Sequence, residues 1–355
     1  MSPLPHNVSE DRLERPGMSS TDISDHNVRT VIAALRQTNA MSRRSLASGL
    51  GLTETAISAI VRRMEGAGYI RQNAAVKGVR GATYSIADTA AAGIGIWLSP
   101  DGGTASLVSL TGRIVREERF ASPDRLGQWL DETVRSHGFG TLCGIALACE
   151  EPLEDKAGAL LASHGGGLAT RLLRSTEAVL WHQRLIADQR TERGLGVIII
   201  GDTVRAGTMF SDRFFHGAHG RAGALGGMRP ALDAPTLNDV AGRKSYLQHM
   251  KNNGSEDEWI NRAASRLLDA IIAMAGFVSP AVIAVGGFLP EMVTQRIVER
   301  VVADKALQAS YFIATKWTPE IQHLCDTDAR IARGAAMVPL RDALLPLPEP
   351  GMMAV

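Results

Sequence analysis

Two short amphipathic segments that meet at Gly51 constrain the fold of this chain more than any other feature. Ser42 is a good N-cap for a helix over residues 43–50, and Thr53 is a good N-cap for the next helix. Gly51 can adopt the positive φ that a sharp turn between two helices requires. Upstream, helical spacing predicts a first helix that ends near Asn39, with its apolar face made by Val28, Val31, Ile32 and Leu35.

The residues on either side of this turn have the spacing of a helix-turn-helix. Ala47 is small where two crossing helices approach each other, and Ile57 and Ile60 begin an apolar stripe that continues through Val61 and Met64. This stripe packs the third helix onto the other two, so its opposite face is free to enter a major groove. A generic three-helix bundle is the alternative, and the agreement of spacing, caps and flanking segments favours the DNA-binding interpretation.

The segment after the third helix predicts a two-stranded wing. Residues 69–72 and 82–86 are the strands, and the basic tip between them contains Lys77 and Arg80. Such a tip suits phosphate or minor-groove contact. We expect bases to be read by Thr53, Glu54, Thr55, Ser58 and Arg62. We expect phosphates or the minor groove to be contacted by Arg43, Arg44, Arg63, Lys77 and Arg80.

Charge is distributed unevenly along the chain, although its net charge is only +1. Residues 26–86 hold nine Lys and Arg against two acids, so this stretch carries +7 and the remainder −6. A basic block on a mildly acidic body is typical of a chain with one part that touches a polyanion. Charge bias alone is also compatible with a solvated surface, so the helix-turn-helix pattern decides the interpretation.

The rest of the chain predicts an α/β body. Apolar runs at residues 93–98 and 104–110 flank Pro100-Asp101-Gly102, which indicates a hairpin, and residues 113–115 add a third strand. Further strands are predicted at 143–149, 197–200 and 282–285, and helices at 126–136, 259–277 and 330–338. We expect four parts: a disordered tail over 1–25, a winged helix-turn-helix over 26–88, a two-lobed α/β body over 92–340 and a Pro-rich tail over 341–355.

The composition predicts a cytoplasmic protein. The first 25 residues mix charges of both signs and lack the apolar core of a secretory signal. The longest uncharged stretch, residues 270–290, is broken by Ser279-Pro280 and Gly286-Gly287 and indicates a helix, a turn and a strand rather than a membrane span. Three cysteines without a Cys-x-x-Cys pair predict neither a disulfide framework nor a zinc knuckle.

Four stretches together resemble the ROK family (repressors, open reading frames and sugar kinases), and specifically its transcriptional-regulator branch. The first is the DNA-binding unit, SRRSLASGLGLTETAISAIVRRMEGAGYI, and the second is LVSLTGRIV. The third, FFHGAHGRAGALGGM, is similar to the family segment that closes the sugar site. The fourth, SPAVIAVGGFLP, is similar to the strand and Gly-Gly turn near the adenosine site, and RGAAM follows it. The resemblance covers residues 28–338 and implies an actin-like, ribonuclease-H-like body of two lobes.

The chain departs from the family's kinases at both phosphate loops. Their Asp-x-Gly-Gly-Thr turn begins with an aspartate whose position falls on Trp97, whereas the similar run at Asp101 comes four residues later, in the hairpin turn. Their second, glycine-rich loop reads Gly201 to Gly207 here, with Asp202 and bulky side chains where a backbone must approach phosphate. We therefore expect no ATP, no cofactor and no phosphotransfer.

The sugar and zinc positions of the family have also changed. The nearest match to the catalytic Asn-Asp-Ala-Asn segment places Asp188 as a candidate carboxylate, and the sugar-clasping Glu and zinc-binding His fall on Ala224 and Gly227. His216 and His219 lack a third ligand, so we expect no zinc. A pocket for an effector, if retained, is expected to use His164, Asp188, His216, His219 and Arg221.

These observations favour a DNA-binding transcriptional regulator, expected to be a repressor, whose inactive ROK body dimerises or tetramerises the protein and senses a sugar-like effector. A partner half-site is expected because one recognition helix reads only about 4–5 base pairs, which implies a palindromic operator. One alternative is a sugar kinase with a fused DNA-binding domain. Another is a ligand-binding scaffold whose basic block contacts a protein.

Overall fold

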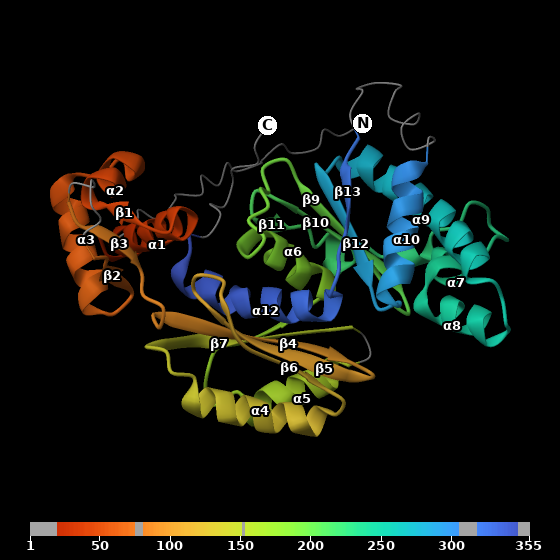
Figure 1. Ribbon diagram of the computed structural model, residues 1–355, viewed down its shortest axis with the longest axis horizontal. Helices are drawn as coiled ribbons and strands as arrows, with labels where there is room; N and C mark the ends of the chain where they lie inside the picture. Colours follow the sequence, from red (N-terminus) through yellow and green to blue (C-terminus); the bar gives the residue numbers. More distant parts are fainter. Residues whose placement is uncertain (1–19, 75–80, 151–152, 305–317, 347–355) are drawn as a thin grey trace, which may run out of the picture.

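The computed structural model describes residues 20–74, 81–150, 153–304 and 318–346. Three sheets organise these residues (Figure 1): a small sheet in the N-terminal domain and one five-stranded sheet in each lobe of the body. The predicted α/β class and the two-lobed body are confirmed. The predicted contacts of Lys77 and Arg80 lie outside the described residues.

The N-terminal domain contains the three helices and the wing that the sequence predicts. The helices are α1 (Ser20–Thr38), α2 (Arg43–Leu50) and α3 (Glu54–Gly66). The strands are β1 (Met41–Ser42), β2 (Ile70–Gln72) and β3 (Thr83–Ile86), in the antiparallel order β1-β3-β2. The two-residue strand β1 was not expected; it pairs Met41 with Tyr84 and so ties the start of α2 to the wing.

The first lobe is built on the predicted three-stranded meander. Its sheet has the order β6-β5-β4-β7-β8, from β4 (Ala91–Ser99), β5 (Gly102–Ser109), β6 (Ile114–Phe120), β7 (Thr141–Cys149) and β8 (Thr170–Leu173). Strands β4, β7 and β8 are parallel. Helices α4 (Pro123–Ser136) and α5 (Glu154–His164) cover one face of this sheet, and α12 (Thr327–Leu344) covers the other (Figure 1).

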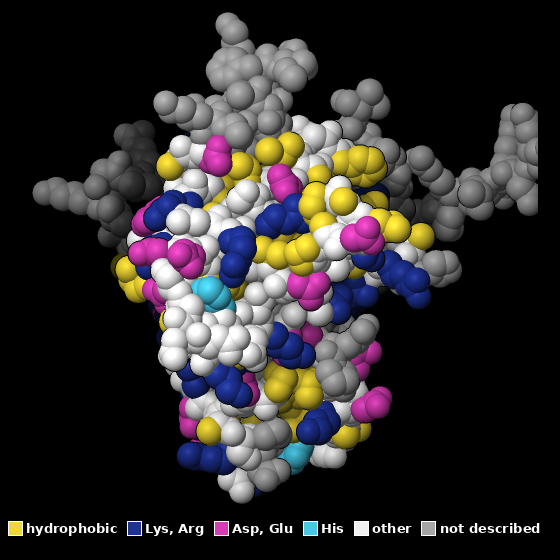
Figure 2. Space-filling model, turned by 90° about the vertical axis from the view of Figure 1, so that its right-hand side faces the viewer, with side chains coloured by type: hydrophobic (Ala, Val, Ile, Leu, Met, Phe, Trp, Pro, Cys, Tyr) yellow, Lys and Arg dark blue, Asp and Glu magenta, His cyan; other side chains and the backbone are white. Residues whose placement is uncertain are grey.

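The second lobe has the sheet order β11-β10-β9-β12-β13. Its strands are β9 (Leu195–Ile200), β10 (Val204–Phe210), β11 (Arg213–Phe214), β12 (Val282–Gly287) and β13 (Glu320–His323). Its helices are α7 (Leu237–Ala241), α8 (Arg243–Lys251), α9 (Glu256–Val278) and α10 (Glu291–Ala303), and single 3-10 turns lie at Ala218–Gly220 and Leu225–Gly227. Charges of both signs are interspersed on the face formed by this lobe (Figure 2).

Helix α12 lies between the lobes, packed on β4 and on α6 (Ser175–Leu185). The contact is backbone to backbone: a Cβ at Gly95 would come within 1.9 Å of the Ala332 carbonyl oxygen, and one at Gly334 within 1.9 Å of the Ala178 carbonyl oxygen. Only glycine permits such an approach.

Both ends of the expected domain plan differ from the helices observed. Helix α1 begins at Ser20, inside the expected tail over 1–25, and α12 continues to Leu344, beyond the expected boundary at 340. Pro339 lies within α12 without ending it. Among the described residues, no helix combines the length and the apolar character needed to cross a membrane.

Candidate functional site

Two side-chain caps hold the helix-turn-helix in shape, as the sequence predicts. The Ser42 hydroxyl accepts a hydrogen bond from the Ser45 amide at 3.1 Å, and the Thr53 hydroxyl accepts one from the Ala56 amide at 3.2 Å. Gly51, between α2 and α3, has a left-handed conformation with φ of 65°. These local interactions fix where α3 begins and therefore which face it turns outward.

Helix α3 separates an apolar inner face from a polar outer face. Ile57, Ile60, Val61 and Met64 are buried in the domain core. On the other side, Thr53, Glu54, Thr55 and Arg62 are exposed and Ser58 is half-buried. The five residues expected to read bases therefore share one accessible helix face.

Four arginines lie on α2 and α3, and Arg62 is itself part of this face. Arg43 stacks over the ring of Tyr84, 5.2 Å from its centroid, which holds the guanidinium beside the wing. Arg44 lies 3.7 Å from the Glu54 carboxylate, and both side chains are mostly exposed, so this ion pair is weak and easily exchanged for a phosphate contact. Arg62 and Arg63 are exposed on α3.

A second candidate site is a cleft of about 660 Å³ between the two lobes. The β4–β5 turn and the end of β6 line one side, and the ends of β9 and β12 with the start of α8 line the other. The start of α12 lies in the same cleft, with Asp326, Thr327 and Asp328. A cavity of this size could hold a small molecule.

Two aromatic rings close part of this cleft. Trp97 from the first lobe stacks on Phe288 from the second, with 5.1 Å between ring centroids and 9° between planes. Trp97 is only 3% exposed.

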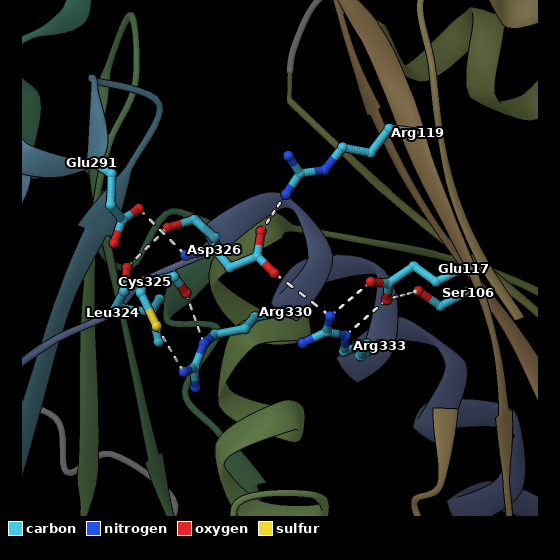
Figure 3. A network of polar contacts seen from close by, with 10 residues as sticks. Ser106, Glu117, Arg119, Glu291, Leu324, Cys325, Asp326, Arg330 and Arg333 are labelled. Atoms are coloured by element: carbon cyan, nitrogen blue, oxygen red, sulfur yellow. Dashed lines mark hydrogen bonds and ion pairs between the residues drawn. The ribbon is translucent and has the colours of Figure 1, made fainter. Parts of the chain in front are cut away.

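Ion pairs join the lobes across the cleft. The Arg243 guanidinium of the second lobe donates to the Asp101 carboxylate of the first lobe at 2.7 Å. Within the second lobe, Lys244 lies 3.4 Å from Asp202. Arg119 on β6 donates to Asp326 at the start of α12 (Figure 3). Asp101 lies in the turn between β4 and β5, as expected, and there it serves as a partner for arginine.

Two carboxyl groups in the cleft are shielded from water. Burial raises the pKa of Glu150, although Ser175 donates to its carboxylate and Arg205 lies 2.9 Å away. Burial also raises the pKa of Asp328, although Arg119 is near. Both groups disfavour added negative charge, which is the opposite of what a triphosphate needs.

Two of the residues expected to bind an effector, His164 and Asp188, lie on different elements. The His164 imidazole is hydrogen-bonded to Asp131 between α5 and α4, with 2.9 Å between Nδ1 and Oδ1. Asp188 follows the C-terminal end of α6, with its side chain 86% exposed, and lies 3.9 Å from Arg184. This location does not fit a role for Asp188 as a base in the cleft. Asp188 lies beyond the C-terminal end of α6 and is not among the residues that line the cleft.

The remaining effector candidates lie on the segment after β11. His216 meets the ring of Phe214 edge-on at 4.8 Å, and Arg221 is exposed. The side chain of His219 is outside the described part of the chain. None of these described candidates lines the cleft. Within the described residues, no group of three or more His, Cys, Asp or Glu side chains could hold a metal ion.

Sequence reasoning missed most residues that line the cleft. Arg205, Arg243, Asp326 and Asp328 come from segments far apart in the chain, and no motif connects them. The available signal was local: Asp202 directly follows Gly201 at the end of β9.

The comparisons with known proteins agree with this architecture. Residues 24–71 match the family model described as winged helix-turn-helix DNA-binding. Among curated proteins, none matches the chain in sequence.

Three solved structures are similar to the chain in fold. A ROK family transcriptional regulator, described as a homolog of the E. coli MLC protein, has a TM-score of 0.70 and 15% identity over 91% of this chain and 98% of its own. A ROK family protein from Streptococcus pneumoniae in complex with sucrose has a TM-score of 0.55 and 17% identity over 71% and 98%. A ROK family glucokinase from Streptomyces griseus in complex with glucose and AMPPNP has a TM-score of 0.54 and 15% identity over 69% and 98%.

The similarity to the transcriptional regulator covers 91% of this chain, whereas the other two cover 71% and 69% of it. The chain thus consists of an N-terminal winged helix-turn-helix DNA-binding domain followed by a body with the two-lobed ROK fold.

Proposed function

We propose that this protein is a sequence-specific transcriptional regulator, acting as a repressor, that binds double-stranded DNA through α3. The observation that carries the proposal is the exposed polar face of a capped recognition helix whose opposite face is buried in the domain core. An α-helix with such a face fits the major groove, where base edges can be distinguished by hydrogen bonding.

The roles of individual residues follow from their place on this surface. Thr53, Glu54, Thr55, Ser58 and Arg62 read bases, and Glu54 accepts from the cytosine amino group once Arg44 has turned to a phosphate. The backbone and minor groove are contacted by Arg43, Arg44, Arg63, Lys77 and Arg80.

The ROK body of this regulator performs no phosphotransfer. Trp97 stands where the kinases carry an aspartate, and Asp202 stands in the second phosphate loop. Two observations support this. The carboxyl groups of Glu150 and Asp328 in the cleft are shielded from water. Arg119 is paired with Asp326, and Arg243 with Asp101. A polyanionic nucleotide would have to displace these pairs and approach Glu150 and Asp328.

A homodimer or homotetramer places two recognition helices on a palindromic operator, because one helix reads too few base pairs for useful specificity. A sugar-like effector is bound by the body. His164, Asp188, His216, His219 and Arg221 stay as candidates, although His164 and Asp188 lie apart in the fold.

The experiment is selection of bound fragments from random and genomic DNA with the purified full chain, repeated with a panel of sugars. Enrichment of a palindromic motif supports the proposal, and a sugar that releases this DNA identifies the effector. ATP-dependent phosphorylation of a hexose would establish the kinase alternative. Failure to enrich any motif, together with no salt-sensitive binding to any duplex, would overturn DNA recognition.

A further inference from the structure

We propose that α12 couples the cleft between the lobes to the DNA-binding domain, so that the ion pairs at one end of this helix determine how firmly α1 is held at the other. The DNA consequence of this inference depends on the proposed regulator function, but the mechanical coupling can be measured without DNA.

At its C-terminal end, α12 holds the winged-helix domain directly. The Arg29 guanidinium on α1 donates from one nitrogen to the carbonyl oxygens of Asp342 and Leu345, both at 3.0 Å. Asp342 lies in the last turn of α12 and Leu345 is its C-cap residue. Carbonyls at a helix C-terminus lack partners within the helix, so a cation is favourable there. These two hydrogen bonds therefore fix α1 at the C-terminal end of α12.

The two domains also share one hydrophobic core at this end. Val31, Ile32 and Leu35 of α1 belong to the same buried cluster as Met337 and Leu340 of α12. The winged-helix domain thus packs on α12 and, through the same cluster, on the start of β4 and the end of β5.

The buried Arg36 of α1 limits the stability of the packing between α1 and α12. Arg36 of α1 donates to the Leu185 carbonyl oxygen at 2.7 Å, and its Nε has no hydrogen-bond partner among the described residues. Burial, together with the nearby Arg184, lowers the pKa of Arg36 to about 10. A buried charge with so few partners weakens the docked arrangement, so small changes at Arg29 can shift it.

At its N-terminal end, α12 is part of the cleft. Asp326 precedes the helix with a left-handed φ of 52° and accepts from Arg119, and it lies 3.5 Å from Arg333 (Figure 3). Arg333, nearly two turns into α12, makes a bidentate contact with Glu117 on β6 at 2.6 and 2.7 Å. Any occupant of the cleft that attracts Arg119 competes with Asp326 and so changes the anchor of α12.

Between its two ends, α12 is packed closely on both lobes. Its middle touches β4 and α6 through backbone atoms, with a Cβ at Gly93 coming within 2.1 Å of the Ala336 carbonyl oxygen. Eighteen helical residues span about 27 Å, so the two ends are too far apart for direct interaction. Small sliding of a packed helix is a known way to transmit such a change.

The test compares Asp326→Asn with Asp101→Asn in the full chain by hydrogen exchange of the α1 amides. Asparagine tolerates the left-handed backbone of residue 326 and removes only the charge. Asp101→Asn is the matched control, because it breaks the pair with Arg243 in the same cleft without touching α12. Loss of a charge-assisted anchor is expected to speed α1 exchange about three-fold or more in Asp326→Asn and not in Asp101→Asn.

Protection of the α3 amides in the same samples shows that the winged-helix domain remains folded. Arg29→Gln is the positive control: it should speed hydrogen exchange of the α1 amides by releasing α1 from α12. If Arg29→Gln has this effect and Asp326→Asn leaves α1 exchange unchanged, the coupling is overturned.

A double-mutant cycle on DNA affinity gives a second test. Independent sites this far apart change affinity by factors that multiply to within about two-fold. The coupling predicts that Asp326→Asn and Arg29→Gln shift affinity in the same direction and that the double variant matches the larger single effect. If the fold-changes in DNA affinity of the two single variants multiply in the double variant, the coupling is overturned and DNA recognition stays intact. Absence of DNA binding by the unaltered protein would overturn the proposed function, and α1 exchange would still decide the coupling.

Discussion

The indole of Trp97 lies flat against the ring of Phe288, 5.1 Å between centroids, and this contact joins the two lobes. Trp97 comes from β4 and Phe288 directly follows β12. Both rings line the cleft between the lobes.

Replacing Trp97 with alanine is expected to lower the free energy of unfolding by about 3–5 kcal/mol, because a buried aromatic side chain is lost and a cavity remains. Chemical denaturation measures this change. Phe277→Ala is the control: that ring is 92% exposed, so the change should stay within about 0.5 kcal/mol. Equal effects of the two substitutions would show that the stack contributes nothing particular.

Two glycines of the helix-turn-helix should respond to alanine in opposite directions. At Gly51 a Cβ meets no atom within 4 Å, but the left-handed φ of 65° makes alanine unfavourable by about 1–2 kcal/mol. At Gly49, inside α2, alanine should stabilise the domain by about 0.5–1 kcal/mol. Thermal unfolding measures both changes. Stabilisation by Gly51→Ala would contradict the observed turn.

His182 makes stability depend on pH. Burial, with Arg330 and Arg333 nearby, lowers the pKa of His182 from 6.5 to about 3, so the folded chain favours the neutral ring. This contribution is complete above pH 6.5 and is lost as pH falls toward 3, because the unfolded chain takes up the proton first. Its limiting slope is about 1.4 kcal/mol per pH unit.

Denaturation of the full chain and of His182→Gln between pH 7 and pH 4 isolates this contribution. The variant should lose stability less steeply with falling pH, since glutamine takes up no proton. Parallel curves for the two proteins would show that His182 already titrates normally in the folded chain.

Two arginines of the DNA-binding surface should differ in what they contribute. Arg62→Ala is expected to weaken binding to the selected operator by about 1–3 kcal/mol and to alter base preference. Arg43→Ala is expected to weaken binding to all duplexes alike and to reduce the salt slope by about 1. Binding titrations on operator and scrambled duplexes measure both, with Lys251→Ala on α8 as a neutral control. Retained affinity and base preference in Arg62→Ala would remove it from the base-reading face.

The helix-turn-helix was predictable because its signals act over a few residues. Ser42, Gly51 and Thr53 each determine the backbone within about one turn, and their roles are the ones observed. The β4–β5 hairpin was predictable for the same reason, since Pro100-Asp101-Gly102 is local turn chemistry.

The cleft was not predictable in this way. Asp101 meets Arg243 across 142 positions of sequence, and Arg119 meets Asp326 across 207. Asp188 was matched to a family motif from a short stretch of sequence alone. In the fold it follows the C-terminal end of α6, with an exposed side chain away from the cleft. Tertiary packing, rather than local pattern, determines which charges meet there.

The central claim, that α3 reads DNA sequence, is tested most directly by measuring the affinity of the purified chain for its selected duplex and for a scrambled duplex across a range of salt concentrations. The account predicts a preference of about 1,000-fold or more for the selected duplex. With five cationic backbone contacts per chain, log affinity should fall against log salt with a slope of about −4 to −5 per chain. Equal affinity for both duplexes, or no binding even at low salt, would contradict it.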